Sequence, residues 1–167
     1  MENYIQLSLK PDWNEIEPIR RESTAFLESH GFSVDTVNAL TMIVSELMEN
    51  AIKYGSFTRS EGQVALTVQV GRRAITVEVS NPIDSSTYQN FQNLRKLDRA
   101  IQWIRGYQDP FEAYLDKLKE IAQKPFADKE SGLGLVRIAY EGRGIVDFFL
   151  DEDGLLNVSV ISSFFER

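Results

Sequence analysis

The sequence predicts an α/β two-layer sandwich, in which a mixed, mostly antiparallel sheet carries helices on one face. Residues 64–70 and 75–79 alternate apolar and polar side chains, as half-buried strands do. Residues 33–54 carry an apolar stripe spaced by three and four residues, which is typical of an amphipathic helix. The chain has 167 residues, of which 43% are hydrophobic and 26% charged. This length and composition predict a single domain over residues 1–167.

The first third of the chain predicts one strand and two helices. Residues 4–9 alternate apolar and polar side chains, so we expect a strand with one buried face. Asp12 then offers an N-cap for a helix that ends at Gly31. Ser33 offers the cap of the second helix, and Gly55 closes it.

The remainder of the chain predicts a helical insertion and a closing hairpin. Residues 84–124 carry the apolar stripes of two helices, which the segment 106–110 separates. A further helix is expected over residues 132–140. The last two strands, 145–150 and 155–161, are joined by an acidic turn that ends in glycine.

Charge and composition exclude several classes of function. The chain has 18 Lys and Arg against 25 Asp and Glu, and its cations are scattered, so nucleic acid is not an expected partner. It has no Cys, which excludes disulfides and thiolate metal sites. No apolar run approaches the roughly 20 residues of a membrane span, and the N-terminus lacks the basic stretch of a secretory signal. We therefore expect a cytoplasmic protein. Its one His, His30, precedes Gly31 and is expected at a helix end.

A first candidate site lies in the segment ELMENAIKYG, residues 46–55. Glu46 and Asn50 are four residues apart, so they project from the same face of the predicted helix, and Lys53 lies close to that face. An amide oxygen suits Mg²⁺, and a carboxylate can accept a proton from an attacking hydroxyl. The alternative is a solvated helix face with a Glu49–Lys53 ion pair.

A second candidate site lies in the segment ESGLGLVRI, residues 130–138. Gly132 and Gly134 stand where a loop enters a helix, and glycines there let the backbone approach a ligand. The N–H groups and dipole of the first helical turn favour a phosphate. The alternative is a plain loop followed by a helical turn.

Together, in this order and separation, the two segments resemble the N box and the G2 box of the GHKL (Bergerat-fold) ATPase superfamily, which includes gyrase, MutL and the histidine kinases. The resemblance covers about residues 30–165. The short chain looks most like anti-sigma-factor serine/threonine kinases of the RsbW and SpoIIAB kind and like the SiaB-like kinases. It implies a Bergerat fold in which residues 85–130 form a helical lid over ATP.

The resemblance also implies roles for individual residues. Asn50 would hold the Mg²⁺ that bridges the ATP phosphates, and Glu46 would act as the catalytic group on the attacking hydroxyl. The remaining residues would contact the nucleotide: Lys53 and Tyr54 beside it, the backbone of Gly132, Leu133 and Gly134 at the phosphates, and Lys129 or Ser131 through their side chains.

The sequence departs from the family pattern after the hairpin. The family has Asp-x-Gly-x-Gly there, where the Asp takes the exocyclic amine of adenine, and this chain has Asn81-Pro82-Ile83-Asp84-Ser85. Asn81 stands at the Asp position, and its carbonyl can accept a hydrogen bond from the amine. Asp84 is the second candidate for this contact. A strand-ending turn without any purine contact is the alternative.

Two functions follow from the resemblance. The first is a regulatory ATP-binding protein kinase that transfers the γ-phosphate to Ser or Thr of a STAS-domain (anti-anti-sigma-like) partner. The second is a non-catalytic interaction module of the same fold, and the missing glycines motivate it. An ATPase switch without a protein substrate is a third option. A homodimer is compatible with the resemblance.

Overall fold

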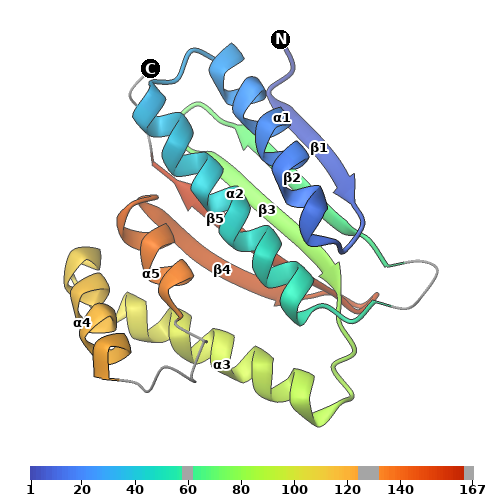
Figure 1. Cartoon of the computed structure of the whole chain (residues 1–167), viewed down its shortest axis with the longest axis vertical. Coiled ribbons are helices and arrows are strands. Elements are labelled where there is room, and N and C mark those ends of the chain that lie inside the picture. The colour runs from blue at the N-terminus through green and yellow to red at the C-terminus, as the bar shows by residue number, and fades with distance from the viewer. Residues whose placement is uncertain (58–61, 124–131, 164–167) are drawn as a thin grey trace.

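A five-stranded sheet with helices on one face forms the fold (Figure 1). The computed structural model describes residues 1–57, 62–123 and 132–163. No helix in these residues is long and apolar enough to cross a membrane. The strands are β1 (Tyr4–Leu9), β2 (Val64–Val70), β3 (Ile75–Pro82), β4 (Gly144–Leu150) and β5 (Leu155–Ser162). The α-helices are α1 (Ile16–Ser29), α2 (Val34–Tyr54), α3 (Tyr88–Arg105), α4 (Pro110–Gln123) and α5 (Leu133–Tyr140).

The two-layer fold predicted from the sequence is confirmed, with one correction to the sheet. The strand order is β1-β2-β3-β5-β4, and all four pairings are antiparallel, so the sheet is not mixed. The helical connection brings β4 back parallel to β3, but the two strands are not neighbours. The final hairpin places β5 between them, with Val79 opposite Val158 and Phe148 opposite Val158 on its other side.

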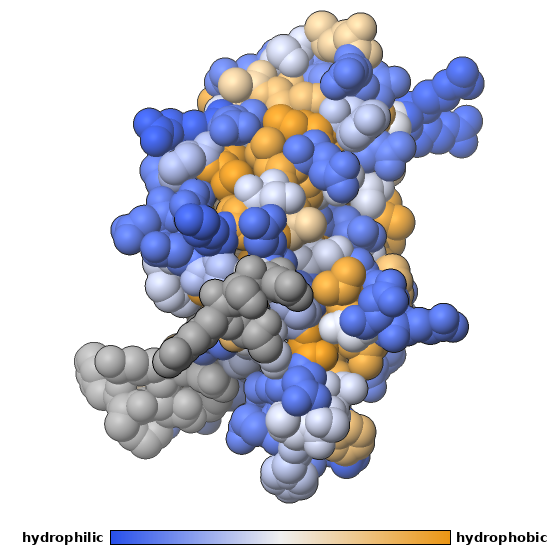
Figure 2. All heavy atoms as spheres, turned by 90° about the vertical axis from the view of Figure 1, so that its right-hand side faces the viewer, coloured by the Kyte–Doolittle hydropathy of each residue, from blue (hydrophilic) through white to orange (hydrophobic). Residues whose placement is uncertain are grey.

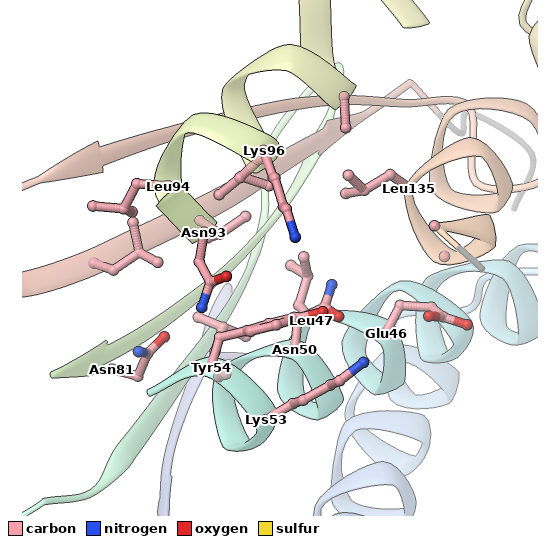
Figure 3. Close-up of a pocket in the computed structure, with 18 of the residues that line it drawn as sticks. Glu46, Leu47, Asn50, Lys53, Tyr54, Asn81, Asn93, Leu94, Lys96 and Leu135 are labelled. Atoms are coloured by element: carbon pink, nitrogen blue, oxygen red, sulfur yellow. The ribbon is translucent and has the colours of Figure 1, made fainter. Parts of the chain in front are cut away.

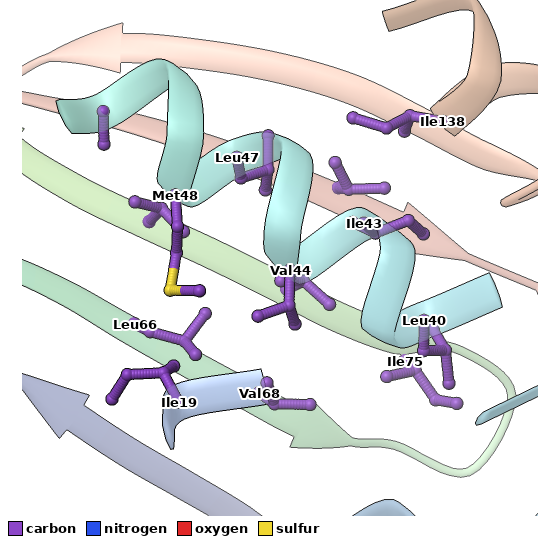
Figure 4. Close-up of a cluster of buried hydrophobic side chains, with 14 of the residues drawn as sticks. Ile19, Leu40, Ile43, Val44, Leu47, Met48, Leu66, Val68, Ile75 and Ile138 are labelled. Atoms are coloured by element: carbon purple, nitrogen blue, oxygen red, sulfur yellow. The ribbon is translucent and has the colours of Figure 1, made fainter. Parts of the chain in front are cut away.

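The core lies between α2 and the centre of the sheet (Figure 4). Leu40, Ile43, Val44 and Met48 face the strands and are fully buried. They meet the inward side chains of β2 and β3, whose burial alternates residue by residue. Each such side chain contributes roughly 1.5–3 kcal/mol when removed from water. This packing fixes the rotation of α2 and therefore decides which of its side chains face away from the core.

The helix boundaries follow local chemistry. The Ser33 hydroxyl accepts a hydrogen bond from the Thr36 N–H at 3.3 Å and caps α2, and Gly55 ends the helix, as predicted. Asp12 caps a short 3-10 turn, Trp13–Glu15, that leads into α1. His30 follows the end of α1, where its ring lies 4.5 Å from that of Phe26.

The sheet edge formed by β1 is covered in part by α1. The apolar residues of β1 alternate with exposed polar ones, and Leu9 at its end is buried in the core. On this side of the molecule, hydrophobic side chains gather in a band that hydrophilic ones surround (Figure 2).

The helices α3 and α4 are held more loosely than α2. Within the described residues, α3 buries only Ile101 and α4 only Ala113, whereas α2 buries nine residues. Aromatic rings join α4 to α5: Phe111 and Tyr114 lie 5.0 and 5.3 Å from Tyr140, centroid to centroid. Elements with few buried apolar contacts open most readily. The two helices fall in the segment predicted as a lid, of which residues 124–130 lie outside the described part of the chain.

Candidate functional site

A cavity of about 390 Å³ opens between α2, the ends of β3 and β5, α3 and the start of α5 (Figure 3). Its volume falls in the range of small-molecule sites, about 300–1,000 Å³. The residues that line it are Glu46, Leu47, Asn50, Ala51, Lys53, Tyr54, Val79, Asn81, Ile83, Asn93, Leu94, Lys96, Leu97, Ala100, Lys117, Gly132, Leu133, Gly134, Leu135, Leu156 and Val158.

The C-terminal half of α2 supplies the polar floor of the cavity. Glu46, Asn50, Lys53 and Tyr54 all line it, and they project from a helix face beside the buried stripe, whose Leu47 and Ala51 also line the cavity. Glu46 and Asn50 are half-buried, so this part of the helix is not a solvated face. Lys53 is exposed, and its ammonium lies 5.0 Å from the centroid of the Tyr54 ring. The helix spacing thus brings together the four residues that the sequence singled out here.

The two sequence motifs meet directly at the start of α5. Gly134 lies against Glu46 so closely that a Cβ on the glycine would overlap the Glu46 carboxylate. Gly132 caps α5 in the left-handed region, with φ of 62°, which favours glycine. A Cβ there would lie 2.9 Å from Cε of Lys117. Both glycines therefore allow close approach, Gly134 to α2 and Gly132 to α4.

Burial and charge give Glu46 an unusual environment. The Arg137 guanidinium donates to Glu46 Oε1 at 3.1 Å and to Glu141 Oε2 at the same distance. Burial raises the pKa of Glu46 above its ordinary value, and the neighbouring carboxylates of Glu49 and Glu141 raise it further, although Arg137 opposes them. Arg137 thus fixes the position of the carboxylate, while burial favours its protonated form. A carboxylate in this setting is a stronger base than one in water.

Asn81 presents a hydrogen-bond acceptor to the far end of the cavity. It is only 2% exposed, and its Nδ2 donates to the carbonyl of Pro82 at 3.0 Å. That bond fixes the orientation of the amide and turns Oδ1 toward the cavity (Figure 3). The walls around it are apolar and include Ile83 and Leu156.

Asp84, the second candidate for the purine contact, lies outside the cavity. It is exposed and does not line the cavity. Its Oδ1 accepts hydrogen bonds from the N–H and the hydroxyl of Ser86, and these bonds lower its pKa. The backbone of Asp84 joins a polar cluster in which the Ser56 hydroxyl accepts from the Asp84 N–H and from Asn90 Nδ2, each at 3.0 Å. Asp84 therefore shapes the turn into α3, and Asn81 remains as the candidate that faces the cavity.

The second motif is described only in part. Gly132, Leu133 and Gly134 line the cavity as the sequence suggested. Lys129 and Ser131 lie outside the described residues.

Three further polar residues in the cavity were not predicted. Asn93 and Lys96 come from α3 (Figure 3), and Lys117 comes from α4. In α3 they flank Leu94 and Leu97, which also line the cavity. In the sequence, Asn93 and Lys96 stand beside the apolar stripe of α3, but the sequence does not show what that stripe packs against.

The other chemical candidates do not join the site. His30 lies at the end of α1, where its Nδ1 is 2.8 Å from the Phe26 carbonyl oxygen and its Nε2 is 3.1 Å from that of Glu2. Within residues 1–57, 62–123 and 132–163, no three His, Cys, Asp or Glu side chains gather as a metal cluster would require.

Comparison with known proteins identifies the family and agrees with the fold. The family model of the histidine kinase-like ATPase domain matches residues 9–140. Among solved structures, a chain of the SiaB–SiaC complex from Pseudomonas aeruginosa is similar, with a TM-score of 0.68 and 16% sequence identity over 96% of this chain and 91% of that one. A similarity at this identity shows a shared fold. No curated protein sequence gives a significant match.

Proposed function

Because the chain belongs to the histidine kinase-like ATPase domain family, we propose that it is a regulatory, ATP-dependent protein kinase acting on Ser or Thr of a partner protein. One observation carries the proposal. A carboxylate and an amide from one turn of α2, and the glycine-flanked start of α5, face a single cavity. These are the groups that phosphoryl transfer needs: a proton acceptor, a metal ligand and a phosphate cradle.

The cavity fits Mg·ATP in three respects. The apolar walls formed by Val79, Ile83 and Leu156 suit a purine ring, and Asn81 Oδ1 offers an acceptor for its exocyclic amine. At the start of α5, the missing side chain of Gly134 lets Glu46 of α2 lie against the first helical turn, and the N–H groups of such a turn favour a phosphate. Asn50 offers a neutral oxygen of the kind that Mg²⁺ takes alongside water. When bound, Mg²⁺ would supply charge neutralisation at the phosphates.

Within this proposal each residue of the chain has a defined task. Glu46 accepts the proton of the partner's hydroxyl while the oxygen forms a bond to the γ-phosphorus and the bond to the bridging oxygen of ADP breaks. Its raised pKa makes it a better proton acceptor. Arg137 holds the carboxylate in place. The helices α3 and α4 act as a lid that excludes water.

The partner is proposed to be a STAS-domain protein. The support is indirect: the similar solved structure is that of a complex between two proteins, SiaB and SiaC.

A second candidate function is a non-catalytic interaction module. The observation that favours it is the continuation of β3 through Asn81 and Pro82, which pair with Leu156 and Leu155 where the family pattern has a glycine-rich loop. In such a module the cavity would take no triphosphate.

Titration calorimetry separates these candidates. We expect the wild-type protein to bind Mg·ATP, and Asn50→Ala to lose that binding while its unfolding transition stays cooperative. Asn38→Ala is the matched control, because Asn38 is exposed on the same helix and far along it from the cavity. Absence of heat with Mg·ATP and Mg·ADP for the wild type would instead support the module.

Transfer of label from γ-labelled ATP to purified STAS-domain proteins tests the kinase step. Label in a partner's Ser or Thr supports the proposal. Release of inorganic phosphate without any partner would support an ATPase switch in its place. Transfer by Asn50→Ala at the wild-type rate would show that these residue roles are wrong.

A further inference from the structure

The cations around the cavity come mainly from α3 and α4. Lys96 of α3 and Lys117 of α4 line it, and α2 adds the exposed Lys53. The side of the cavity formed by α2 holds instead the carboxylate of Glu46 and the amide of Asn50. In a chain with a net charge of −7, two cations from separate helices converge on one cavity.

Lys96 is directed into the cavity without a protein anion to hold it. Its Nζ points from α3 toward α2, on the side of Asn50 and Leu47 (Figure 3). Within the described residues, no carboxylate lies within ion-pair distance of it, whereas Arg105 on the same helix pairs with Asp147 at 3.9 Å. An ammonium group aimed at a cavity in this way is available to an anion that enters it.

Lys117 lies over the first turn of α5. Its Nζ is 3.3 Å from the position of a Cβ on Gly132, and its side chain is 19% exposed. Gly132 provides no side-chain cap, so the positive end of the helix dipole and the ammonium group lie together. Glu120, one turn away on α4, accepts from Lys117 at 3.3 and 3.4 Å, which is long for a charged pair. Two adjacent positive groups favour an anion between them.

We infer that Lys96 and Lys117 bind the polyphosphate of the nucleotide from the α3–α4 side, opposite Asn50 and Gly134. The inference rests on the proposed function and adds two residues to it. The phosphates then link α3 and α4 to the floor of the cavity. A nucleoside without phosphates would contact only the apolar walls and Asn81, so it would leave both lysines without a ligand.

Calorimetric titration of Lys96→Met and Lys117→Met with Mg·ATP, Mg·ADP and adenosine tests the inference. Methionine keeps an unbranched apolar stem of similar length and removes the charge together with the N–H donors of the ammonium group. Hydrogen bonds to charged groups correspond to roughly 10- to 100-fold in affinity. We expect a loss of this size for Mg·ATP in each variant, a smaller loss for Mg·ADP and no change for adenosine. Lys119→Met is the control, because Lys119 is exposed on α4 and does not line the cavity.

An arginine substitution at one of the two positions gives a second test. Lys117→Arg keeps the charge, so it should retain most of the Mg·ATP affinity that Lys117→Met loses. Equal losses for adenosine and Mg·ATP would show that the lysines act only on the structure of the cavity and would overturn the inference. Unchanged Mg·ATP affinity in both Met variants would overturn it while leaving the proposed function intact. Absence of Mg·ATP binding by the wild type would overturn the proposed function and this inference with it.

Discussion

Substitution of Gly134 by Ala tests the contact that joins the two motifs. The added Cβ would overlap Oε2 of Glu46 and lie 3.1 Å from its Cδ. The obstacle is the end of a side chain, so it can move. Its movement would disturb the 3.1 Å ion pair that Oε1 of Glu46 makes with Arg137. The stability of Gly134→Ala therefore depends on whether residue 46 still carries a carboxylate.

The expected magnitude follows from two opposing effects. Ala is more favourable than Gly inside a helix by about 0.5–1 kcal/mol. Adding a methyl group to a filled site costs about 1–3 kcal/mol. In the wild-type background we therefore expect Gly134→Ala to lower the free energy of unfolding by up to about 2.5 kcal/mol. In a Glu46→Ala background the space is vacant, and the same substitution should raise it by about 0.5–1 kcal/mol. The coupling between the sites is then about 1–3 kcal/mol.

Urea denaturation of the wild type, both single variants and the double variant measures this coupling. Gly106→Ala is the control, because Gly106 has a right-handed φ of −70° at the end of α3, and a Cβ there meets only the Trp103 carbonyl at 3.3 Å and the Gln102 carbonyl at 3.7 Å. Its effect should be the same in both backgrounds. If Gly134→Ala also has one effect in both backgrounds, then α5 does not approach Glu46 as described.

Three further predictions concern the core, a helix cap and the purine end of the cavity. Leu40→Ala should lower the free energy of unfolding by about 2–5 kcal/mol in urea denaturation, because Leu40 is fully buried in the core; a loss below about 1 kcal/mol would contradict that packing. Ser33→Ala should cost about 0.5–2 kcal/mol in the same assay through loss of the α2 cap, and Ser33→Asn should restore most of it. Asn81→Leu should weaken Mg·ATP binding roughly tenfold, because it removes the hydrogen-bond acceptor at the purine end of the cavity. Asp84→Ala should change the affinity by no more than about twofold, because Asp84 lies outside the cavity. A larger loss for Asp84→Ala than for Asn81→Leu would indicate that Asp84, and not Asn81, contacts the purine.

The sequence predicts the fold well wherever a local pattern decides the structure. The stripe of α2 and the alternation of β2 and β3 are each periodic over a whole element, and caps such as Ser33 mark their ends. The order of the strands is a different matter. Whether β4 or β5 pairs with β3 is a choice between contacts distant in sequence, and no pattern within either strand decides it. The expectation of a mixed sheet is wrong for this reason.

The site residues likewise fall into those that a local pattern predicts and those that depend on the packing of distant elements. Glu46 and Asn50 can be placed on one face from the helix period alone, and the glycines of the second motif mark a helix start. Asn93, Lys96 and Lys117 could not be assigned, because their role depends on how α3 and α4 pack against the rest of the chain. The family match supports the GHKL resemblance, yet it assigns no role to any of these residues.

The raised pKa of Glu46 predicts a pH dependence of stability with a defined sign. Its folded-state pKa lies above the ordinary value of 4.5, mainly because burial disfavours the charged form. The folded state therefore binds the proton more tightly than the unfolded state does. The stability that this proton contributes is fully present below pH 4.5 and is lost as the pH rises through the folded-state pKa.

Glu46→Gln removes this titration while keeping the shape of the side chain. The difference in unfolding free energy between Glu46→Gln and the wild type should therefore shift in favour of the variant as the pH rises above 4.5, and then level off once Glu46 is ionised. Urea denaturation at a series of pH values measures it, with exposed Glu22→Gln as control. A difference that shifts toward the wild type with rising pH would mean that Arg137, and not burial, governs the carboxylate. In that case Glu46 would be a weaker base than the proposed kinase mechanism needs, since an ion pair that lowers its pKa would also lower its affinity for the hydroxyl proton.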